Sequence, residues 1–213
     1  MSTKAPLQNR VTPTGDIIAT SARGLYMGNR GGRIHDPETR TLTNRRWASQ
    51  RWICCVTDFK GRSREIMGDG YTELFFLDEP TALAAGHRPC FECRRDDAKA
   101  FAQAFPWSRL AQGTSSTAAL DKVLHGDRLD GRHQRHFQAR LADLPDGAFV
   151  AIGDAPYALL DRRLIAWTVD GYRSAAPNTS EGEITVLTPK CICEALANGY
   201  RPHWHPSAEA ALG

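Results

Sequence analysis

The feature that most restricts the fold of this chain is a close pair of cysteines, Cys90 and Cys93. The pair follows the step Arg88-Pro89, where a chain reversal is expected, and it precedes a helical pattern over about residues 91–105. Two thiolates at such a turn can reach one tetrahedral metal ion, and the N-terminus of the following helix favours negatively charged sulfur. A small metal-centred unit is therefore predicted around this pair.

A redox role is the alternative for two cysteines at this spacing. Redox pairs usually follow a strand in a thioredoxin-like βαβ unit. Here the preceding segment is predicted to be a helix over Glu79 to Ala85, with Asp78 as its N-cap, Pro80 in its first turn and Gly86 at its C-terminal stop. This order of elements favours zinc ligation over redox chemistry.

The other cysteines also occur in close pairs, Cys54 with Cys55 and Cys191 with Cys193. The start of the chain, Met1 to Arg10, is polar and lacks the apolar core of a signal peptide. No apolar run approaches the length that a bilayer span needs. We therefore expect a cytoplasmic protein without membrane contact, whose cysteines are reduced thiols or metal ligands rather than disulfides.

The residues around the cysteine pair resemble a known zinc module. From Glu79 to Arg95 the sequence reads EPTALAAGHRPCFECRR. This is similar to the zinc-binding module of the bacterial Ada DNA-repair proteins, in which an aromatic strand and a short helix precede A-L-A-A-G-aromatic-R-P-C-x-x-C. His87 stands where that module has an aromatic residue. A weaker similarity upstream, from Tyr26 to His35, extends the resemblance to about residues 25–97.

The resemblance implies a zinc cofactor, a DNA partner contacted through arginines, and a zinc-bound cysteine that takes an alkyl group from a phosphotriester. Cys54 or Cys55 would be that nucleophile. The chain departs from the family, whose other two ligands are cysteines a few residues apart. Because adjacent residues of a strand point to opposite faces, only one of these two cysteines is expected to ligate. We favour Cys55, with Cys54 as a buried core thiol, His35 as the fourth ligand and His87 as its rival.

Charge is distributed unevenly along the chain. The net charge is +3, yet residues 23–64 carry nine Arg and one Lys against three acidic residues, a local charge of +7. Such a basic region favours an anionic partner, of which nucleic acid is the usual one, and the resemblance implies DNA. A solvated basic face is the alternative. The candidate nucleic-acid contacts are Arg30, Arg33, Arg45, Arg46, Arg51, Lys60, Arg62 and Arg88.

Three further polar residues are candidates for catalysis. Glu73 lies near the cysteine pair in sequence, and a carboxylate beside zinc can act as a general base; an ion-paired strand residue is the alternative. His125 and Asp127 open a polar cluster that extends to His136. That cluster is suited to phosphate contacts or to catalysis, and a solvated helix end explains it equally well.

The pattern of elements predicts an α+β fold. We expect a flexible arm over 1–22, a zinc-stabilised small sheet with helices over 23–140, and a small β-rich part with a C-terminal helix over 141–213. The function predicted is that of a zinc-binding, nucleic-acid-directed protein, in DNA binding, DNA repair or the processing of modified DNA. The alternative is a purely structural zinc in an interaction module or in a small-molecule enzyme whose site lies in the C-terminal half.

Overall fold

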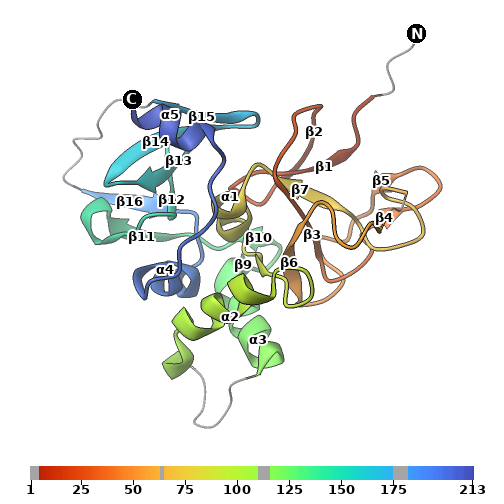
Figure 1. Cartoon of the computed structure of the whole chain (residues 1–213), viewed down its shortest axis with the longest axis horizontal. Coiled ribbons are helices and arrows are strands. Elements are labelled where there is room, and N and C mark those ends of the chain that lie inside the picture. The colour runs from red at the N-terminus through yellow and green to blue at the C-terminus, as the bar shows by residue number, and fades with distance from the viewer. Residues whose placement is uncertain (1–4, 63–64, 110–115, 175–181) are drawn as a thin grey trace.

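The protein has an α+β fold in which two sheets flank one short, buried helix. The computed structural model describes residues 5–62, 65–109, 116–174 and 182–213. Helix α1 (Glu79–Ala84) lies between the sheets, and helices α2 (Arg95–Ala104), α3 (Thr117–Arg128) and α4 (Lys190–Ala197) gather at one end of the molecule (Figure 1). A last helix, α5 (Ser207–Leu212), packs on the second sheet.

The first sheet has six strands in the order β2-β1-β7-β3-β6-β8. Pairing is antiparallel except for the β1–β7 and β6–β8 pairs, which are parallel. The central strand β3 pairs with both β6 and β7, and the β3–β7 pairing joins segments more than forty residues apart in sequence. The strands are β1 (Gln8–Val11), β2 (Ile17–Ala19), β3 (Tyr26–Arg30), β6 (Trp52–Val56), β7 (Leu74–Phe76) and β8 (Arg88–Pro89).

The N-terminal segment, for which a flexible arm was expected over residues 1–22, contributes two strands to this sheet. Residues 1–4 lie outside the described part of the chain. Val11 is buried against Leu74 and Phe76 in the core beneath the sheet, and Gly15 takes a φ of +77° at the turn between β1 and β2. The arm expectation fails for residues 8–19 because β1 pairs with β7 and because Val11 and Ile17 pack on the core beneath the sheet.

The second sheet, also six-stranded, has the order β11-β16-β12-β13-β14-β15 with antiparallel neighbours throughout. Its first strand, β11, falls in a polar, basic stretch where no strand was expected. Strand β11 alternates half-buried Phe137 and Ala139 with exposed residues, and it pairs along its length with β16. The strands are β11 (Phe137–Arg140), β12 (Phe149–Ile152), β13 (Ala155–Leu160), β14 (Arg163–Thr168), β15 (Gly171–Ser174) and β16 (Glu183–Val186).

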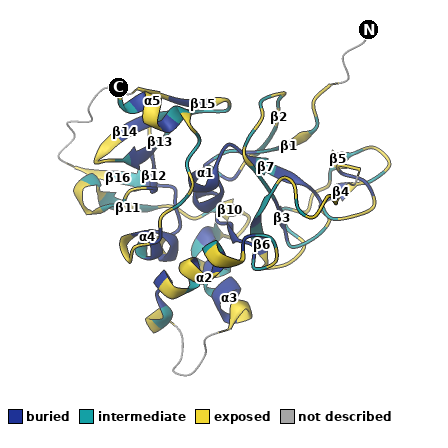
Figure 2. Ribbon diagram, viewed as in Figure 1, coloured by how far each residue is buried: buried dark blue, intermediate teal, exposed yellow. Residues whose placement is uncertain are grey.

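Helix α1 joins the two sheets and is buried along its whole length (Figure 2). Asp78 is its N-cap, as predicted, and accepts a hydrogen bond from the Thr81 amide at 3.0 Å. The same carboxylate accepts from the Tyr172 hydroxyl of the second sheet at 2.9 Å. Gly86 ends the helix with a φ of +79°, also as predicted, and a Cβ there would lie 2.6 Å from Arg128 Cδ. The Asp78 carboxylate therefore caps α1 and also hydrogen-bonds to the second sheet.

Helix α2 begins at Arg95, four residues later than the predicted start, because residues 91–94 form a turn. Its apolar face packs against α3 and α4 in a helical core that includes Phe101, Leu120 and Ile192. The remaining short elements are two hairpins, β4 (His35–Asp36) with β5 (Thr41–Leu42) and β9 (Leu129–Asp130) with β10 (His133–Gln134), and 3-10 turns at Trp107–Arg109 and Leu141–Asp143.

Candidate metal centre

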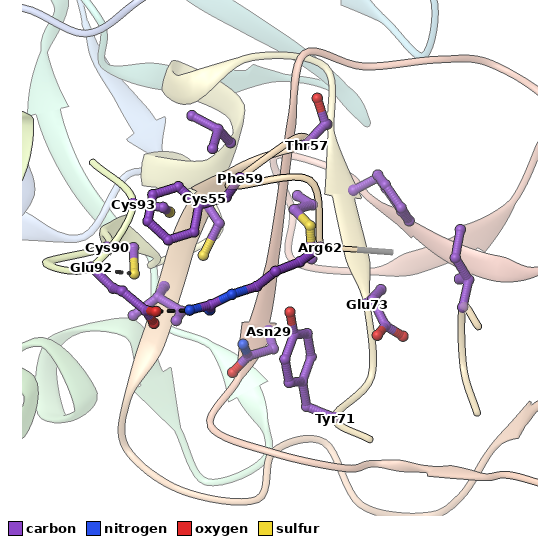
Figure 3. A pocket seen from close by; sticks show the side chains of 15 residues that line it. Asn29, Cys55, Thr57, Phe59, Arg62, Tyr71, Glu73, Cys90, Glu92 and Cys93 are labelled. Atoms are coloured by element: carbon purple, nitrogen blue, oxygen red, sulfur yellow. Dashed lines mark hydrogen bonds and ion pairs between the residues drawn. The ribbon is translucent and has the colours of Figure 1, made fainter. Parts of the chain in front are cut away.

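Three cysteine side chains converge at one edge of the first sheet. Cys55 lies on β6, whereas Cys90 and Cys93 lie on the turn that follows β8. The Cys90 amide donates to the Cys54 carbonyl at 2.9 Å, which continues the β6–β8 pairing and sets the turn beside β6. The three Sγ atoms lie within 4.8 Å of one another (Figure 3). Three sulfur donors at this separation can hold one metal ion.

The neighbouring residues Cys54 and Cys55 have opposite environments. Cys54 is fully buried, and its sulfur accepts a hydrogen bond from Arg94 Nη1 at 3.4 Å. Burial raises the pKa of the Cys54 thiol well above its ordinary range. Cys55 is half-buried and points to the side where Cys90 lies. Because strand side chains alternate, β6 presents one sulfur to the cluster and directs the other into the core.

The three clustered sulfurs lie close enough to hydrogen-bond to one another in the metal-free protein. Hydrogen bonds from the Cys55 and Cys93 thiols lower the pKa of Cys90 to about 2, with help from the Glu92 amide, which lies 3.4 Å from the Cys90 sulfur. The same hydrogen bond to Cys90 raises the pKa of Cys55 above its ordinary range. The environment therefore already stabilises negative charge on one sulfur of the cluster.

The cluster opens onto a cavity of about 350 Å³, which we call the cysteine pocket. Glu73, a buried residue of the segment before β7, lies across this pocket from the three sulfurs (Figure 3). Its Oε2 accepts from the Met67 amide at 2.8 Å, while its Oε1 has no hydrogen-bond partner among the described residues. The residues labelled in Figure 3 that line the pocket are Asn29, Cys55, Thr57, Phe59, Arg62, Tyr71, Glu73, Cys90, Glu92 and Cys93.

A charged pair spans the pocket beside the sulfurs. Arg62 donates to the Glu92 carboxylate at 2.8 Å, and its guanidinium lies 5.3 Å from the centre of the Phe59 ring. The ammonium of Lys60 lies 5.1 Å from the same ring. Both cations are exposed, so this side of the pocket presents an aromatic ring flanked by positive charge.

Neither histidine proposed as fourth ligand reaches the cluster. His35 is buried with Nδ1 at 2.6 Å from Thr72 Oγ1 and Nε2 at 2.8 Å from the Gly68 carbonyl, so both ring nitrogens already have partners. His87 is buried between the rings of Trp52 and Phe76, at 5.1 and 4.7 Å between ring centroids. The assignment of His35 as a ligand is therefore corrected, since these hydrogen bonds hold the ring away from the three sulfurs.

Two of the eight basic residues predicted to contact nucleic acid are buried. Arg30 and Arg88 are each 2% exposed. The Arg88 guanidinium forms a two-bond ion pair with Asp121 at 2.9 and 2.8 Å, and Arg30 donates to the Gly15 carbonyl at 2.7 Å. A surface role for these two is corrected accordingly. The other six are exposed or, for Arg46, half-buried: Arg33, Arg45, Arg46, Arg51, Lys60 and Arg62.

The candidate pair His125 and Asp127 lies outside the cysteine pocket and is engaged within the fold. His125 Nδ1 is 3.0 Å from Arg128 Nη2, and its ring packs edge-on against Trp47. The Asp127 carboxylate accepts from Arg109 at 2.7 Å and from the Cys191 amide at 2.8 Å. Asp127 thus holds the start of α4, a position set by the packing of α3 against α4.

A buried ionic network behind the cluster was missed at the level of sequence. Arg94, next to Cys93, donates to Glu79 at 2.7 Å, and both side chains are buried. Glu79 also accepts from the Tyr200 hydroxyl at 2.5 Å and from the His203 amide at 2.9 Å. The network ties the cysteine turn to α1 and to the segment after α4. No local pattern signals it, because the partners meet only in the folded chain.

Comparisons of the chain with protein-family models, with curated proteins and with solved structures give no match. Among the described residues, none of the helices has the length and apolar character needed to cross a bilayer. The three-cysteine group could hold a metal ion, and it does not by itself specify which one.

Proposed function

We propose that this protein is a zinc protein directed at nucleic acid, in which Cys55, Cys90 and Cys93 hold one zinc ion. The observation that carries the proposal is the approach of the three sulfur atoms to within 4.8 Å of one another. Thiolate donors in a roughly tetrahedral arrangement select zinc over hard cations such as magnesium or calcium. A separation of this size also suits sulfurs that share one ion.

The position of the cysteines at a pocket supports a zinc site with one coordination position open to a ligand, rather than a site closed by four protein ligands. Structural zinc sites have four protein ligands, whereas reactive sites keep one position free. Among the described residues only three cysteines meet here, and all three line the cysteine pocket. A bound zinc would supply a Lewis acid and keep its sulfurs as thiolates. Glu73 lines the same pocket across from the sulfurs, and its unpartnered Oε1 is buried.

The surface around the pocket supports nucleic acid as the partner. Lys60 and Arg62 are exposed beside Phe59, and a ring flanked by cations suits a base and its neighbouring phosphates. Exposed Arg33, Arg45 and Arg51 extend the positive charge along the chain. DNA, and DNA repair or the processing of modified DNA, is the finer part of this proposal and follows from the Ada-like resemblance.

In the alkyl-transfer chemistry that the resemblance implies, a cysteine thiolate attacks the alkyl carbon of a phosphotriester. A sulfur–carbon bond forms, the carbon–oxygen bond breaks, and the phosphodiester leaves with the electron pair. Cys55 is the member of the Cys54–Cys55 pair that suits this role, because its sulfur lines the pocket. Cys54 is unsuited, because it is fully buried and held by Arg94.

The proposal is tested by metal analysis and DNA binding on the same samples. Wild-type protein should carry about one zinc per chain, Cys90→Ser should lose it, and Cys193→Ser, which changes a buried cysteine far from the pocket, should keep it. Binding to duplex and single-stranded DNA should weaken steeply with salt, and Lys60→Ala with Arg62→Ala should reduce the salt slope. Zinc without salt-dependent DNA binding would leave the site structural and contradict the nucleic-acid part.

A further inference from the structure

A second cluster of charge lies away from the cysteine pocket, and its two buried arginines form no direct ion pair in the described part of the chain. Arg30 and Arg128 are 2% and 1% exposed. Arg30 donates to the Gly15 carbonyl at 2.7 Å, and Arg128 donates to the Gly86 and Gln50 carbonyls at 2.8 and 2.6 Å. Neutral acceptors therefore hold both guanidiniums. Buried charges are costly unless they are paired, and these two are not.

Both guanidiniums also contact one aromatic ring. The Cζ atoms of Arg30 and Arg128 lie 4.4 and 4.0 Å from the centre of the Trp52 ring. Asp121, the carboxylate that acts most on Arg128, is itself held by two hydrogen bonds from Arg88. Burial lowers the pKa of both Arg30 and Arg128 to about 9. Arg30 and Arg128 thus contact the same ring, and neither forms an ion pair among the described residues.

Three residues with unpartnered buried atoms line one small cavity. The donors Arg30 Nε and Arg128 Nε and the acceptor Gln134 Oε1 are buried and have no hydrogen-bond partner among the described residues, so a ligand oxygen that carries a proton, such as a P–OH group, would suit all three. All three side chains line a cavity of about 10 Å³, roughly the space of one water molecule or one oxygen atom. Half-buried Arg46 lines it as well, and a Cβ at Gly15 would lie 2.7 Å from Gln134 Oε1. We call this cavity the arginine pocket.

We propose that the arginine pocket is a binding site for a phosphate group, with one phosphate oxygen in the cavity between Arg30 and Arg128 and with Arg46 beside it. Guanidiniums match the shape and charge of phosphate oxyanions, and a dianion would pair directly with positive charge on which Asp121 and Asp16 act only without an ion pair. The ligand is inorganic phosphate or the terminal phosphate of a nucleic acid. This site lies apart from the zinc site and needs no metal.

The first experiment measures thermal unfolding of the zinc-loaded chain in sodium phosphate and in sodium chloride of the same ionic strength. A ligand that binds the native state raises the unfolding temperature saturably. Phosphate should do so and chloride should not. A short oligonucleotide with a 5′-phosphate, compared with the same oligonucleotide lacking it, then separates a terminal nucleic-acid phosphate from free phosphate as the natural ligand.

A matched pair of variants locates the effect. Arg46→Ala removes the half-buried pocket arginine, and Arg173→Ala removes an exposed arginine of the second sheet that does not line the pocket. Phosphate affinity should fall about tenfold or more in Arg46→Ala, because a charge-assisted contact is lost, and should stay unchanged in Arg173→Ala. Zinc content should remain at the wild-type level in both variants, which separates this site from the metal centre.

Three results would overturn the proposal. One is an equal rise in unfolding temperature with phosphate and with chloride. Another is the absence of any effect of either inorganic phosphate or the 5′-phosphate. The third is equal weakening in Arg46→Ala and Arg173→Ala, which would indicate general electrostatic attraction rather than a site.

Discussion

A comparison of the pair Cys90 and Cys93 with the pair Cys191 and Cys193 shows that closeness in sequence alone does not make a metal site. Cys90 and Cys93 lie on a turn, and their sulfurs converge with that of Cys55. Cys191 and Cys193 lie on α4, where residues two apart point to different sides. Cys191 packs in the core of the helices and Cys193 in the core of the second sheet.

The pKa values of the cysteine thiols also differ between the two regions. Hydrogen bonds within the cluster lower the pKa of Cys90 to about 2, whereas burial raises the pKa of Cys193 to about 12 and that of Cys191 well above its ordinary range. One region prepares a thiolate at the edge of a pocket. The other uses the thiol as a small apolar group.

The largest expected effect separates the two pairs by metal binding. Cys90→Ser should reduce zinc affinity on the order of 100-fold or more, because one of three sulfur ligands is removed. Cys193→Ser should leave zinc affinity unchanged while it destabilises the fold. Competition of each variant with a chromophoric chelator measures the affinity. Equal loss of zinc in the two variants would erase the distinction between the regions.

The ionic network behind the cluster gives the next largest effect. Glu79→Gln should lower the free energy of unfolding by about 1.5–3 kcal/mol, because a buried charge-assisted hydrogen bond from Arg94 is weakened while Arg94 keeps its ion pair with Asp97 at 2.8 Å. Urea unfolding of the zinc-loaded protein measures this, with Glu92→Gln at an exposed position as the control. If Glu79→Gln lowers the free energy of unfolding by less than Glu92→Gln does, the network does not join the cysteine turn to the rest of the fold.

Thiol alkylation compares the reactivity of the clustered cysteines with that of the core cysteines, residue by residue. In the metal-free native protein, Cys90 should react with iodoacetamide at least about tenfold faster than Cys54, Cys191 and Cys193, because its pKa is lowered and it lines the pocket, and thiolate is the reactive form. Zinc should protect Cys90. Mass spectrometry of peptides reports the site of each adduct. Rapid labelling of Cys54 or Cys191 in the native state would contradict the assigned burial.

The smallest effect concerns the exposed pair at the pocket. Arg62→Ala should change the free energy of unfolding by only about 0–1 kcal/mol, because surface ion pairs are screened by solvent. Zinc content should not change, while DNA affinity should fall modestly at low salt. Loss of zinc in this variant would mean that the pair helps to form the metal centre, which the geometry does not indicate.

Local rules account for the parts of the fold that could be predicted. The Asp78 cap, the Gly86 stop and the short helix between them depend on neighbouring residues, and they are observed. Strand alternation likewise separates Cys55, which faces Cys90, from Cys54, which faces the core. These features need no knowledge of the distant chain.

Tertiary burial accounts for the parts that could not be predicted. Arg30 and Arg88 look like surface cations in the sequence, but aromatic and carboxylate partners from other elements bury them. His35 looks like a ligand until Thr72 and Gly68 occupy its ring nitrogens. Charge and histidine content are sequence properties, whereas the availability of a side chain depends on contacts formed across the fold.

The most direct test of the account is zinc X-ray absorption spectroscopy on the zinc-loaded wild-type protein. The account predicts three sulfur neighbours at about 2.3 Å and one lighter donor at about 2.0–2.2 Å, which would be a pocket ligand in the open position. Four sulfur neighbours would contradict the open site, because Cys54 or a second chain would have to join the cluster. The absence of sulfur neighbours would contradict the metal centre itself.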